Sequence, residues 1–346
     1  MGKRESNLDL LRVLASLMVI VIHVSNPFAA EGMNHYDESF MVGNFFYTIA
    51  CFSAPMFMLL SGGFMLSQPR NRAYKSLFET SLKRRLIYPT IFWSLFYVLL
   101  AYLEIFMEKG ERIVILSKWS EPLKDLLLGS PCYHLWYMFV AIGLNLMVPL
   151  LIELKEKIGE EAFMKLGLVV MLLDIPIAFF SDLFWVVRFI IYLGYFMLGY
   201  SLKHTFKCSW RGRTFLAIAI LMKIAIFFLV DHFVLMKSEY AFDFFNFLSP
   251  FAIIYALCFY MFFLKIRVGS ASKVITSLAR HSFHIYLIHA LFVSSLHLLL
   301  LKKLALEISP MVYIPVASVL VFGMSWISSN LLNYFKERIY WLRYSG

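Results

Sequence analysis

The chain has 346 residues, of which 61% are hydrophobic and 16% are charged, and its mean hydropathy is +0.74. Soluble domains average about 45–50% apolar and about 25% charged residues, so this composition excludes an ordinary soluble protein and indicates a polytopic membrane protein. The net charge of +10 would favour a nucleic-acid partner only if the basic residues formed one face. They are instead scattered over short loops, so we expect no nucleic acid.

The first apolar segment contains charged residues and is not followed by a small-residue cleavage site, which predicts an uncleaved span rather than a signal peptide. No Pro- or Ser-rich linker divides the chain, so we expect a single integral membrane domain over residues 1–346 and no separate soluble domain. The four cysteines are isolated and lack a paired metal-ligand spacing. We interpret them as small apolar side chains and expect no metal site.

The apolar segments predict an all-α polytopic fold with about ten transmembrane helices, because a span needs about 20 mostly apolar residues. In this arrangement the loops on the N-terminal side hold 22 of the 32 Lys and Arg, and the opposite loops hold 7. Cytoplasmic loops carry the excess of Lys and Arg, so both termini are expected in the cytoplasm. The predicted spans are residues 8–29, 41–66, 86–106, 134–152, 165–181, 184–202, 214–235, 245–264, 278–300 and 310–335.

The first span carries three groups that a bilayer should reject, namely Asp9, Arg12 and His23. Eleven steps of about 100° place Arg12 and His23 within roughly 20° of one helix face, roughly 16 Å apart along the axis. An arginine at mid-bilayer costs on the order of 2.5–3.5 kcal/mol, and Asp9 is close enough to pair with it. One alternative is an orienting ion pair beside a packed histidine. Arginine and histidine together on one buried face favour a functional site.

Span 2 ends with a small-residue run, Ser61-Gly62-Gly63, which allows close approach of either a ligand or another helix. Three adjacent cations, Lys83, Arg84 and Arg85, stand directly before the third span. They satisfy the positive-inside rule by themselves, and they would also suit a polyphosphate on the cytoplasmic side. The sequence does not decide between a ligand and a helix as the partner of the small-residue run. It also does not decide between membrane orientation and polyphosphate binding for the three cations.

Two later spans add histidine and aromatic side chains. Span 4 opens at the outer interface with "YHLWYMF", where His134 beside Trp136 suits a sugar or polar ligand, although an aromatic belt would also place tryptophan there. Span 9 contains "RHSFHIYLIHALF", with Arg280 at the cytoplasmic end and His289 near the midplane, where an imidazole needs a cavity. Lys223 in span 7 is interpreted as a snorkelling side chain without an assigned role.

These stretches together resemble the acyltransferase-3 family of integral membrane acyltransferases, and the resemblance covers nearly the whole chain. The family's first-span signature is an Arg, ten residues and a His, which are Arg12 and His23 here. "YHLW", "YLGYFMLGY" and "RHSFHIYLIHALF" especially resemble the enterobacterial common antigen O-acetyltransferase type within this family. The family often has Gly where this chain has His284. The other matching stretches are the "SG" end of span 2 and the basic stretch Lys83 to Pro89.

The resemblance implies an acetyl-CoA-dependent O-acetyltransferase, which moves an acyl group from cytoplasmic acyl-CoA to a hydroxyl of a cell-envelope glycan or lipid-linked saccharide. It also implies a multi-pass location in the inner (plasma) membrane, contact with membrane lipids and no tightly bound cofactor. The donor-binding residues that it implies are Ser61, Gly62, Lys83, Arg84, Arg85 and Arg280. The acceptor-binding residues that it implies are His134, Trp136, Tyr286 and His289.

His23 is the expected general base, or else the residue that carries the acyl group between donor and acceptor. An imidazole titrates near neutral pH and so suits proton removal from a hydroxyl. Arg12 keeps its charge and is expected to stabilise thioester or phosphate oxygens. Two other classes stay open, a ligand-binding sensor and a transporter or flippase of a lipid-linked glycan. The internal repeats typical of transporters are not seen in the sequence.

Overall fold

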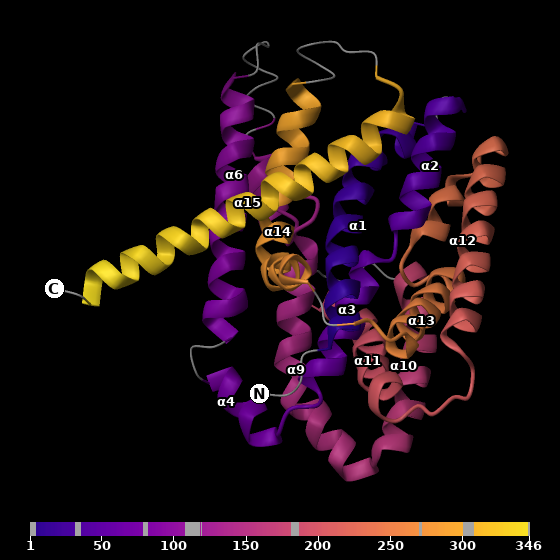
Figure 1. Ribbon diagram of the computed structural model, residues 1–346. Coiled ribbons are helices and arrows are strands. Elements are labelled where there is room, and N and C mark those ends of the chain that lie inside the picture. The colour runs from indigo at the N-terminus through magenta and orange to yellow at the C-terminus, as the bar shows by residue number, and fades with distance from the viewer. Residues whose placement is uncertain are drawn as a thin grey trace. The chain divides into compact units, whose positions relative to one another are not determined.

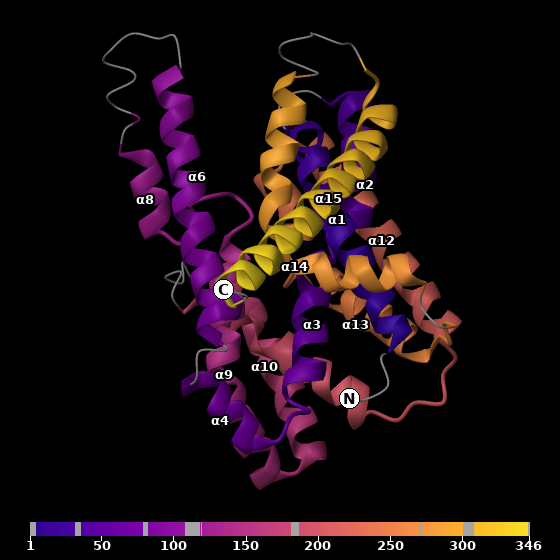
Figure 2. The same cartoon turned by 60° about the vertical axis from the view of Figure 1, so that its left-hand side comes forward.

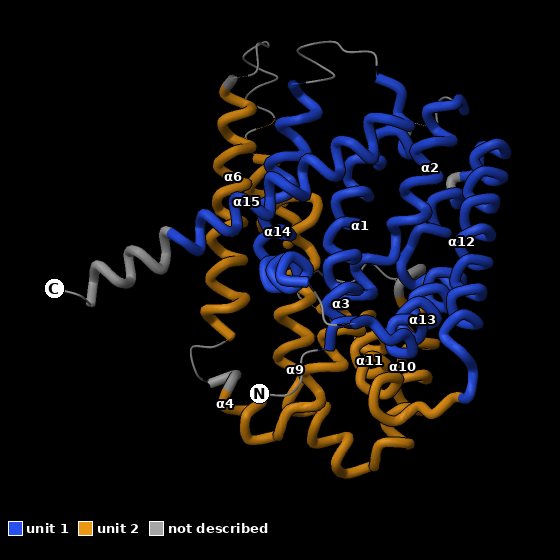
Figure 3. The backbone as a smooth tube through the Cα atoms, viewed as in Figure 1, with its two compact units in different colours: residues 1–57, 209–346 blue, residues 58–208 orange. Residues whose placement is uncertain are grey.

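The computed structural model describes residues 5–31, 36–78, 82–107, 118, 120–180, 187–269, 272–299 and 308–344. Within these ranges the chain forms helices and no strands, so the predicted all-α class is confirmed. The chain divides into two compact units, which we describe separately (Figure 3). Unit 1 comprises residues 1–57 and 209–346, and unit 2 comprises residues 58–208.

Unit 1 is built around the first helix, α1 (Ser6–Glu31), which is buried along its length. Leu11, Ala15 and Ile20 are fully buried, because α1 packs against α2, α14 and α15 (Figure 1). α12 runs beside α13 and also contacts α2 (Figure 2). The other helices of this unit are α2 (Glu38–Ala50), the start of α3 (Ser53–Met65), α12 (Gly212–Leu235), η3 (Glu239–Phe245), α13 (Pro250–Lys265), α14 (Lys273–His297) and α15 (Pro310–Tyr344).

Polar side chains set where helices of unit 1 begin. An Asp37 carboxylate oxygen accepts the backbone N–H of Phe40 at 2.8 Å and so caps α2. The Ser249 hydroxyl caps α13 and the Ser272 hydroxyl caps α14 in the same way. These caps satisfy N–H groups that have no partner within their own helix.

The second predicted span is not one continuous helix. α2 ends at Ala50, the chain turns at Cys51 and Phe52, and α3 begins at Ser53. Pro55 lies in the first turn of α3, where its missing N–H is tolerated, whereas in the interior of one long helix it would remove a hydrogen bond. Two half-helices therefore replace the single helix that the sequence predicts over residues 41–66.

Unit 2 contains a tight helical hairpin, formed by α9 (Trp136–Ile158) and α10 (Glu160–Phe180). The residue between them, Gly159, has a φ of +82°, in the left-handed region that favours glycine. α11 (Leu193–His204) packs along α10. The remaining elements are the rest of α3, α4 (Arg70–Phe78), the π-helical turn η1 (Lys83–Ile87), α6 (Tyr88–Met107), α8 (Glu121–Leu127) and the 3₁₀ helix η2 (Arg188–Tyr192).

α10 and α11 share a buried polar contact. Asp174 in α10 is 2% exposed, and its carboxylate accepts the backbone N–H of Gly194 at 3.3 Å. Gly194 is the second residue of α11, where the helix itself offers the N–H no partner. A side chain from one helix thus completes the N-terminus of the next.

A second set of polar contacts joins the α9–α10 turn to the end of α11. The Tyr200 hydroxyl donates to Glu160 at 2.7 Å, which lowers the pKa of this carboxyl. The Lys155 ammonium donates to the Leu66 carbonyl at 2.6 Å and lies 3.9 Å from the centroid of the Tyr200 ring. These contacts hold the ends of α3, α9 and α11 together.

Seven segments in the described ranges are long and apolar enough to cross a membrane, which supports a multi-pass membrane protein. Three of the ten predicted spans are not among them. α10 carries Glu160, Glu161, Lys165 and Asp174, α11 has only 12 residues, and α14 contains four histidines that lower its hydropathy. The count of ten therefore stays a prediction. The seven segments are 6–30, 38–65, 83–106, 136–158, 212–235, 240–265 and 310–334.

Two glycines allow α3 and α11 to cross at backbone contact. A Cβ placed on Gly62 would lie 1.8 Å from the Phe196 carbonyl oxygen, and one on Gly199 would lie 2.1 Å from the Leu59 carbonyl oxygen. Each glycine comes from a different helix, so both sides of the crossing depend on the absence of a side chain.

Replacing Gly62 by Ala should destabilise the protein, because the new methyl group would push against backbone rather than against a flexible side chain. Overpacking typically costs about 1–3 kcal/mol, and we expect a lower thermal midpoint and a lower yield in detergent. Gly323→Ala in α15 is the matched control, since a Cβ there meets nothing within 4 Å. Equal midpoints for the two variants would contradict this account of the crossing.

Candidate active site

Two of the predicted site histidines stack on each other inside unit 1. His23 comes from α1 and His289 from α14, and their ring centroids are 5.4 Å apart with 24° between the ring planes. α1 and α14 pack closely, which brings residues from opposite ends of the chain into contact. His23 is partly buried and His289 is 0% exposed, so the inner ring is shielded from bulk water and the outer ring keeps some accessible surface.

The backbone fixes the proton on the inner histidine. Nδ1 of His289 lies 2.6 Å from the Tyr286 carbonyl oxygen. A carbonyl oxygen only accepts, so Nδ1 carries the proton and Nε2 is the basic nitrogen of the neutral ring. The Tyr286 ring also lies beside His289, with 5.8 Å between ring centroids. The sequence predicts that His289 needs a cavity near the midplane. In the structure, the Tyr286 carbonyl gives this ring a polar partner within its own helix.

Arg12 pairs with Asp9 as predicted. The shortest distance between a guanidinium nitrogen and a carboxylate oxygen is 3.6 Å. Asp9 is buried, whereas the Arg12 side chain keeps 30% of its surface exposed. α1 is continuous from Ser6 to Glu31, so the predicted separation of about 16 Å along the axis between Arg12 and His23 holds for this helix. The guanidinium is therefore oriented by Asp9 and still accessible.

The start of α14 places the predicted residue Arg280, and a further histidine, away from the His23–His289 pair. Arg280 is exposed. His281 is buried, and its Nδ1 lies 2.8 Å from the Ser277 carbonyl of the same helix. About 12 Å of helix separates His281 from His289, so the two rings lie in different surroundings.

In unit 2, the predicted donor-binding residues have two different environments. The Ser61 side chain hydrogen-bonds the Tyr137 hydroxyl, and the open side of Gly62 faces the Phe196 carbonyl of α11. Lys83, Arg84 and Arg85 are all exposed on the π-helical turn that leads into α6. π-helical turns occur frequently at functional sites, and these three cations are accessible to an anionic ligand.

The predicted acceptor-binding residues of unit 2 lie among aromatic rings that the sequence analysis did not select. His134 is 2% exposed and meets the Tyr97 ring edge-on, with ring centroids 5.2 Å apart. Trp136 lies beside Tyr192, with ring centroids 5.8 Å apart. Tyr97 stands in an apolar span without a distinguishing local pattern, whereas Tyr192 begins the "YLGYFMLGY" stretch that the sequence analysis quoted without assigning this residue a role.

The structure thus groups the predicted residues by unit. Arg12, His23, Arg280, Tyr286 and His289 belong to unit 1. Ser61, Gly62, Lys83, Arg84, Arg85, His134 and Trp136 belong to unit 2. That the residues of unit 1 and the residues of unit 2 lie close together therefore stays a prediction. Over the part of the chain that the structure describes, no three His, Cys, Asp or Glu side chains are grouped to hold a metal ion.

One partly buried cation, interpreted from the sequence as snorkelling, makes specific contacts inside unit 1. Lys223, in the middle of α12, contacts Thr48 and Cys51 of unit 1 instead of reaching toward a membrane surface. In the sequence, the only sign of these contacts is that Lys223 lies within a predicted span, where an ionisable residue is a functional candidate by default.

These features define a multi-pass helical membrane protein with an accessible arginine and a stacked histidine pair centred on its first helix. Residues 5–330 match the family described as "Acyltransferase domain" (Acyl_transf_3), and the chain belongs to this family. The match spans both units and confirms the family that the sequence motifs indicate. No curated protein and no solved structure matches the chain. The protein is thus a membrane acyltransferase.

Proposed function

We propose that this protein transfers an acyl group, most simply acetyl, from acyl-CoA to a hydroxyl of a cell-envelope glycan or lipid-linked saccharide. The observation that carries the proposal is the stacked His23–His289 pair, because it sets a partly accessible imidazole against a fully buried one whose Nδ1 lies against the Tyr286 carbonyl. The family membership supports acyl transfer as the reaction type. The resemblance to the enterobacterial common antigen O-acetyltransferase type supports the glycan acceptor.

Two routes use the same histidine. In the first, His23 removes the acceptor's hydroxyl proton while the oxygen attacks the thioester carbonyl. The C–S bond then breaks, and the proton passes to the departing CoA thiolate. In the second, the His23 nitrogen attacks the thioester and releases CoA thiol. The acceptor hydroxyl then attacks the acyl-imidazole and leaves its proton on the ring. In both routes His289 acts as a positioning residue behind His23.

Arg12 is proposed to stabilise the negative charge that develops on the thioester oxygen, or to bind a donor phosphate. Its guanidinium is oriented by Asp9 and keeps an exposed surface, and a fixed cation in a water-poor site interacts strongly with developing charge. Ser61, Gly62, Lys83–Arg85 and Arg280 are proposed to bind the donor. His134, Trp136 and Tyr286 are proposed to bind the acceptor, whereas the fully buried His289 is proposed to position His23 instead.

The proposed arrangement in the cell follows from the charge bias of the loops. Both termini and the cations of Lys83–Arg85 would face the cytoplasm, where acyl-CoA is found, and the chain would cross the inner membrane about ten times. A transporter or flippase without acyl transfer is not favoured, because the family match supports an acyltransferase.

The decisive experiment mixes purified protein in detergent or nanodiscs with radiolabelled acetyl-CoA and follows CoA thiol release and label transfer. We expect slow CoA release without acceptor and faster release, with label in the glycan fraction, when envelope saccharides are added. No CoA release above a heat-denatured control, with any acyl-CoA offered, would contradict the proposal.

Removing two of the exposed cations tests donor binding. Changing Arg84 and Arg85 together to Ala should raise the KM for acyl-CoA more than it lowers kcat, because these residues would contact phosphates and not the reacting atoms. A charge-assisted contact contributes roughly 1.5–3 kcal/mol, so we expect at least about a tenfold increase in KM for the pair. Steady-state kinetics at varied acyl-CoA concentration measures this effect.

The matched control is Arg211→Ala with Arg213→Ala, which removes two exposed cations from another segment predicted to be cytoplasmic. That variant should keep the KM of the wild type. If the two double variants behave alike, Arg84 and Arg85 serve membrane orientation alone.

A further inference from the structure

The break between α2 and α3 leaves a helix end inside an apolar layer, and Lys223 meets it. The Lys223 ammonium donates to the Thr48 carbonyl, in the last turn of α2, and its nitrogen lies 3.1 Å from the Cys51 sulfur. The Tyr255 ring centroid is 4.0 Å from the same nitrogen. The carbonyl end of a helix carries partial negative charge, so the cation stabilises the broken span.

These contacts do not neutralise Lys223. Among the described residues, no carboxylate lies within salt-bridge distance of its ammonium. An ammonium group has three N–H donors, and two of them are accounted for by Thr48 and Cys51. Ionisable groups inside a span pair with one another or with backbone carbonyls, and the third N–H, which lies near the Tyr255 ring, can donate to an anionic ligand.

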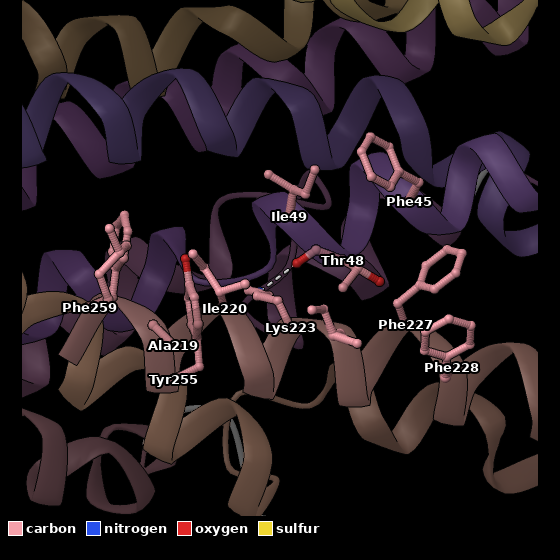
Figure 4. Close-up of a pocket in the computed structure, with 12 residues that line it drawn as sticks. Phe45, Thr48, Ile49, Ala219, Ile220, Lys223, Phe227, Phe228, Tyr255 and Phe259 are labelled. Atoms are coloured by element: carbon pink, nitrogen blue, oxygen red, sulfur yellow. Dashed lines mark hydrogen bonds between the residues drawn. The ribbon is translucent and has the colours of Figure 1, made fainter. Parts of the chain in front are cut away.

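Lys223 is among the residues that line a pocket between α2, α12 and α13 (Figure 4). The pocket has a volume of about 420 Å³, and Thr48, Lys223 and Tyr255 are the only polar residues among the twelve that line it. Ligand pockets usually range from about 300 to 1,000 Å³. This pocket therefore fits a slender apolar group with one polar end.

The mouth of the pocket consists of exposed apolar side chains. Phe45 is 44% exposed, Ile220 is 50% exposed and Phe228 is 62% exposed. They belong to segments long and apolar enough to cross a membrane, so this exposed surface would face lipid tails. A ligand would therefore enter sideways from the bilayer.

The depth of Lys223 limits the kind of anion that can reach it. Lys223 is 11 residues from the start of α12 and 12 from its end, or roughly 16–18 Å from either helix terminus. The hydrocarbon core is about 30 Å thick, so Lys223 lies near its middle. A phospholipid headgroup is held at the membrane surface, whereas a free long-chain acid can enter the core in its uncharged form. Its proton returns to the aqueous phase when the carboxylate pairs with the ammonium.

We propose that this pocket binds a long-chain carboxylic acid, with its carboxylate on Lys223 and its tail against the phenylalanine and isoleucine side chains of α2 and α12. The ammonium and carboxylate together carry no net charge, which removes the cost of an unpaired cation in the bilayer. The site is separate in its residues from the His23–His289 pair and does not depend on the proposed acyl-transfer function.

Equilibrium binding of radiolabelled oleate to the full-length protein in nanodiscs tests this inference, with oleyl alcohol as the uncharged probe of equal chain length. Wild type should bind oleate more tightly than oleyl alcohol. Lys223→Met keeps the length of the side chain but removes its charge, and should weaken oleate binding at least about tenfold, as expected for a lost charge-assisted contact. The alcohol should bind Lys223→Met as it binds wild type.

Two further variants make the result independent of folding defects. Ile220→Trp fills the mouth of the pocket but leaves Lys223 in place, and should reduce binding of both probes. Lys207→Met removes an exposed loop lysine and should change neither. Equal binding of oleate and oleyl alcohol by wild type would overturn the proposal. So would unchanged oleate binding by Lys223→Met or, should that variant not fold, by Ile220→Trp.

Discussion

His23→Gln should lower turnover by about 10²–10⁴ while leaving the fold intact, as expected for the loss of a general base. Glutamine has a similar size and keeps hydrogen-bonding capacity, but its amide cannot accept and release a proton at neutral pH. His23 stacks on His289 without supplying the hydrogen bond that fixes His289 Nδ1, which comes from the Tyr286 carbonyl. Yield, thermal midpoint and radiolabelled acyl transfer should be measured on the same preparation.

His232→Gln is the control for this experiment, since it makes the same substitution at an exposed histidine of α12 in the same unit. It should retain wild-type turnover. Near wild-type turnover by His23→Gln would remove both the general-base and the acyl-carrier roles and leave the histidine pair as a packing feature. A low midpoint combined with normal turnover per folded molecule would lead to the same conclusion.

Arg12→Gln should reduce kcat by about 10²–10³, the usual effect of removing one donor to a developing negative charge. Arg12→Lys should restore only part of the activity, because lysine keeps the charge but not the planar fork of donors. The comparison of kcat with KM shows whether Arg12 acts on the transition state or only binds the donor.

Arg12→Gln also removes the cation that pairs with the buried Asp9, which should lower the thermal midpoint. The double variant Asp9→Asn with Arg12→Gln separates the two effects. It should recover the thermal midpoint but not the activity. If activity returns together with stability, Arg12 has a structural role and the proposed charge stabilisation is wrong.

Local features of the sequence were sufficient to predict the first span and its ion pair. Helical periodicity placed Arg12 and His23 on one face, and the three-residue spacing placed Asp9 beside Arg12. The all-α class and the multi-pass character followed from composition. These inferences needed only the geometry of one helix and the cost of charge in a bilayer.

Contacts between distant segments could not be predicted in this way. The stacking of His23 on His289 depends on how α1 packs against α14, and the crossing at Gly62 depends on the course of α11. Lys223 was interpreted as snorkelling because periodicity gives its face but not its neighbours. Those neighbours come from the break at Cys51, after which Pro55 lies in the first turn of α3.

The contact between Asp174 and Gly194 has a consequence for how the protein enters the membrane. In the predicted ten-span arrangement α10 forms the fifth span, where a buried aspartate is costly, and the hydrogen-bond partner of Asp174 lies 20 residues further along the chain. While α10 leaves the ribosome, the partner that satisfies Asp174 has not yet been synthesised. α10 is therefore expected to settle in the bilayer only after α11 emerges, so that the two helices insert as one cooperative step of biogenesis.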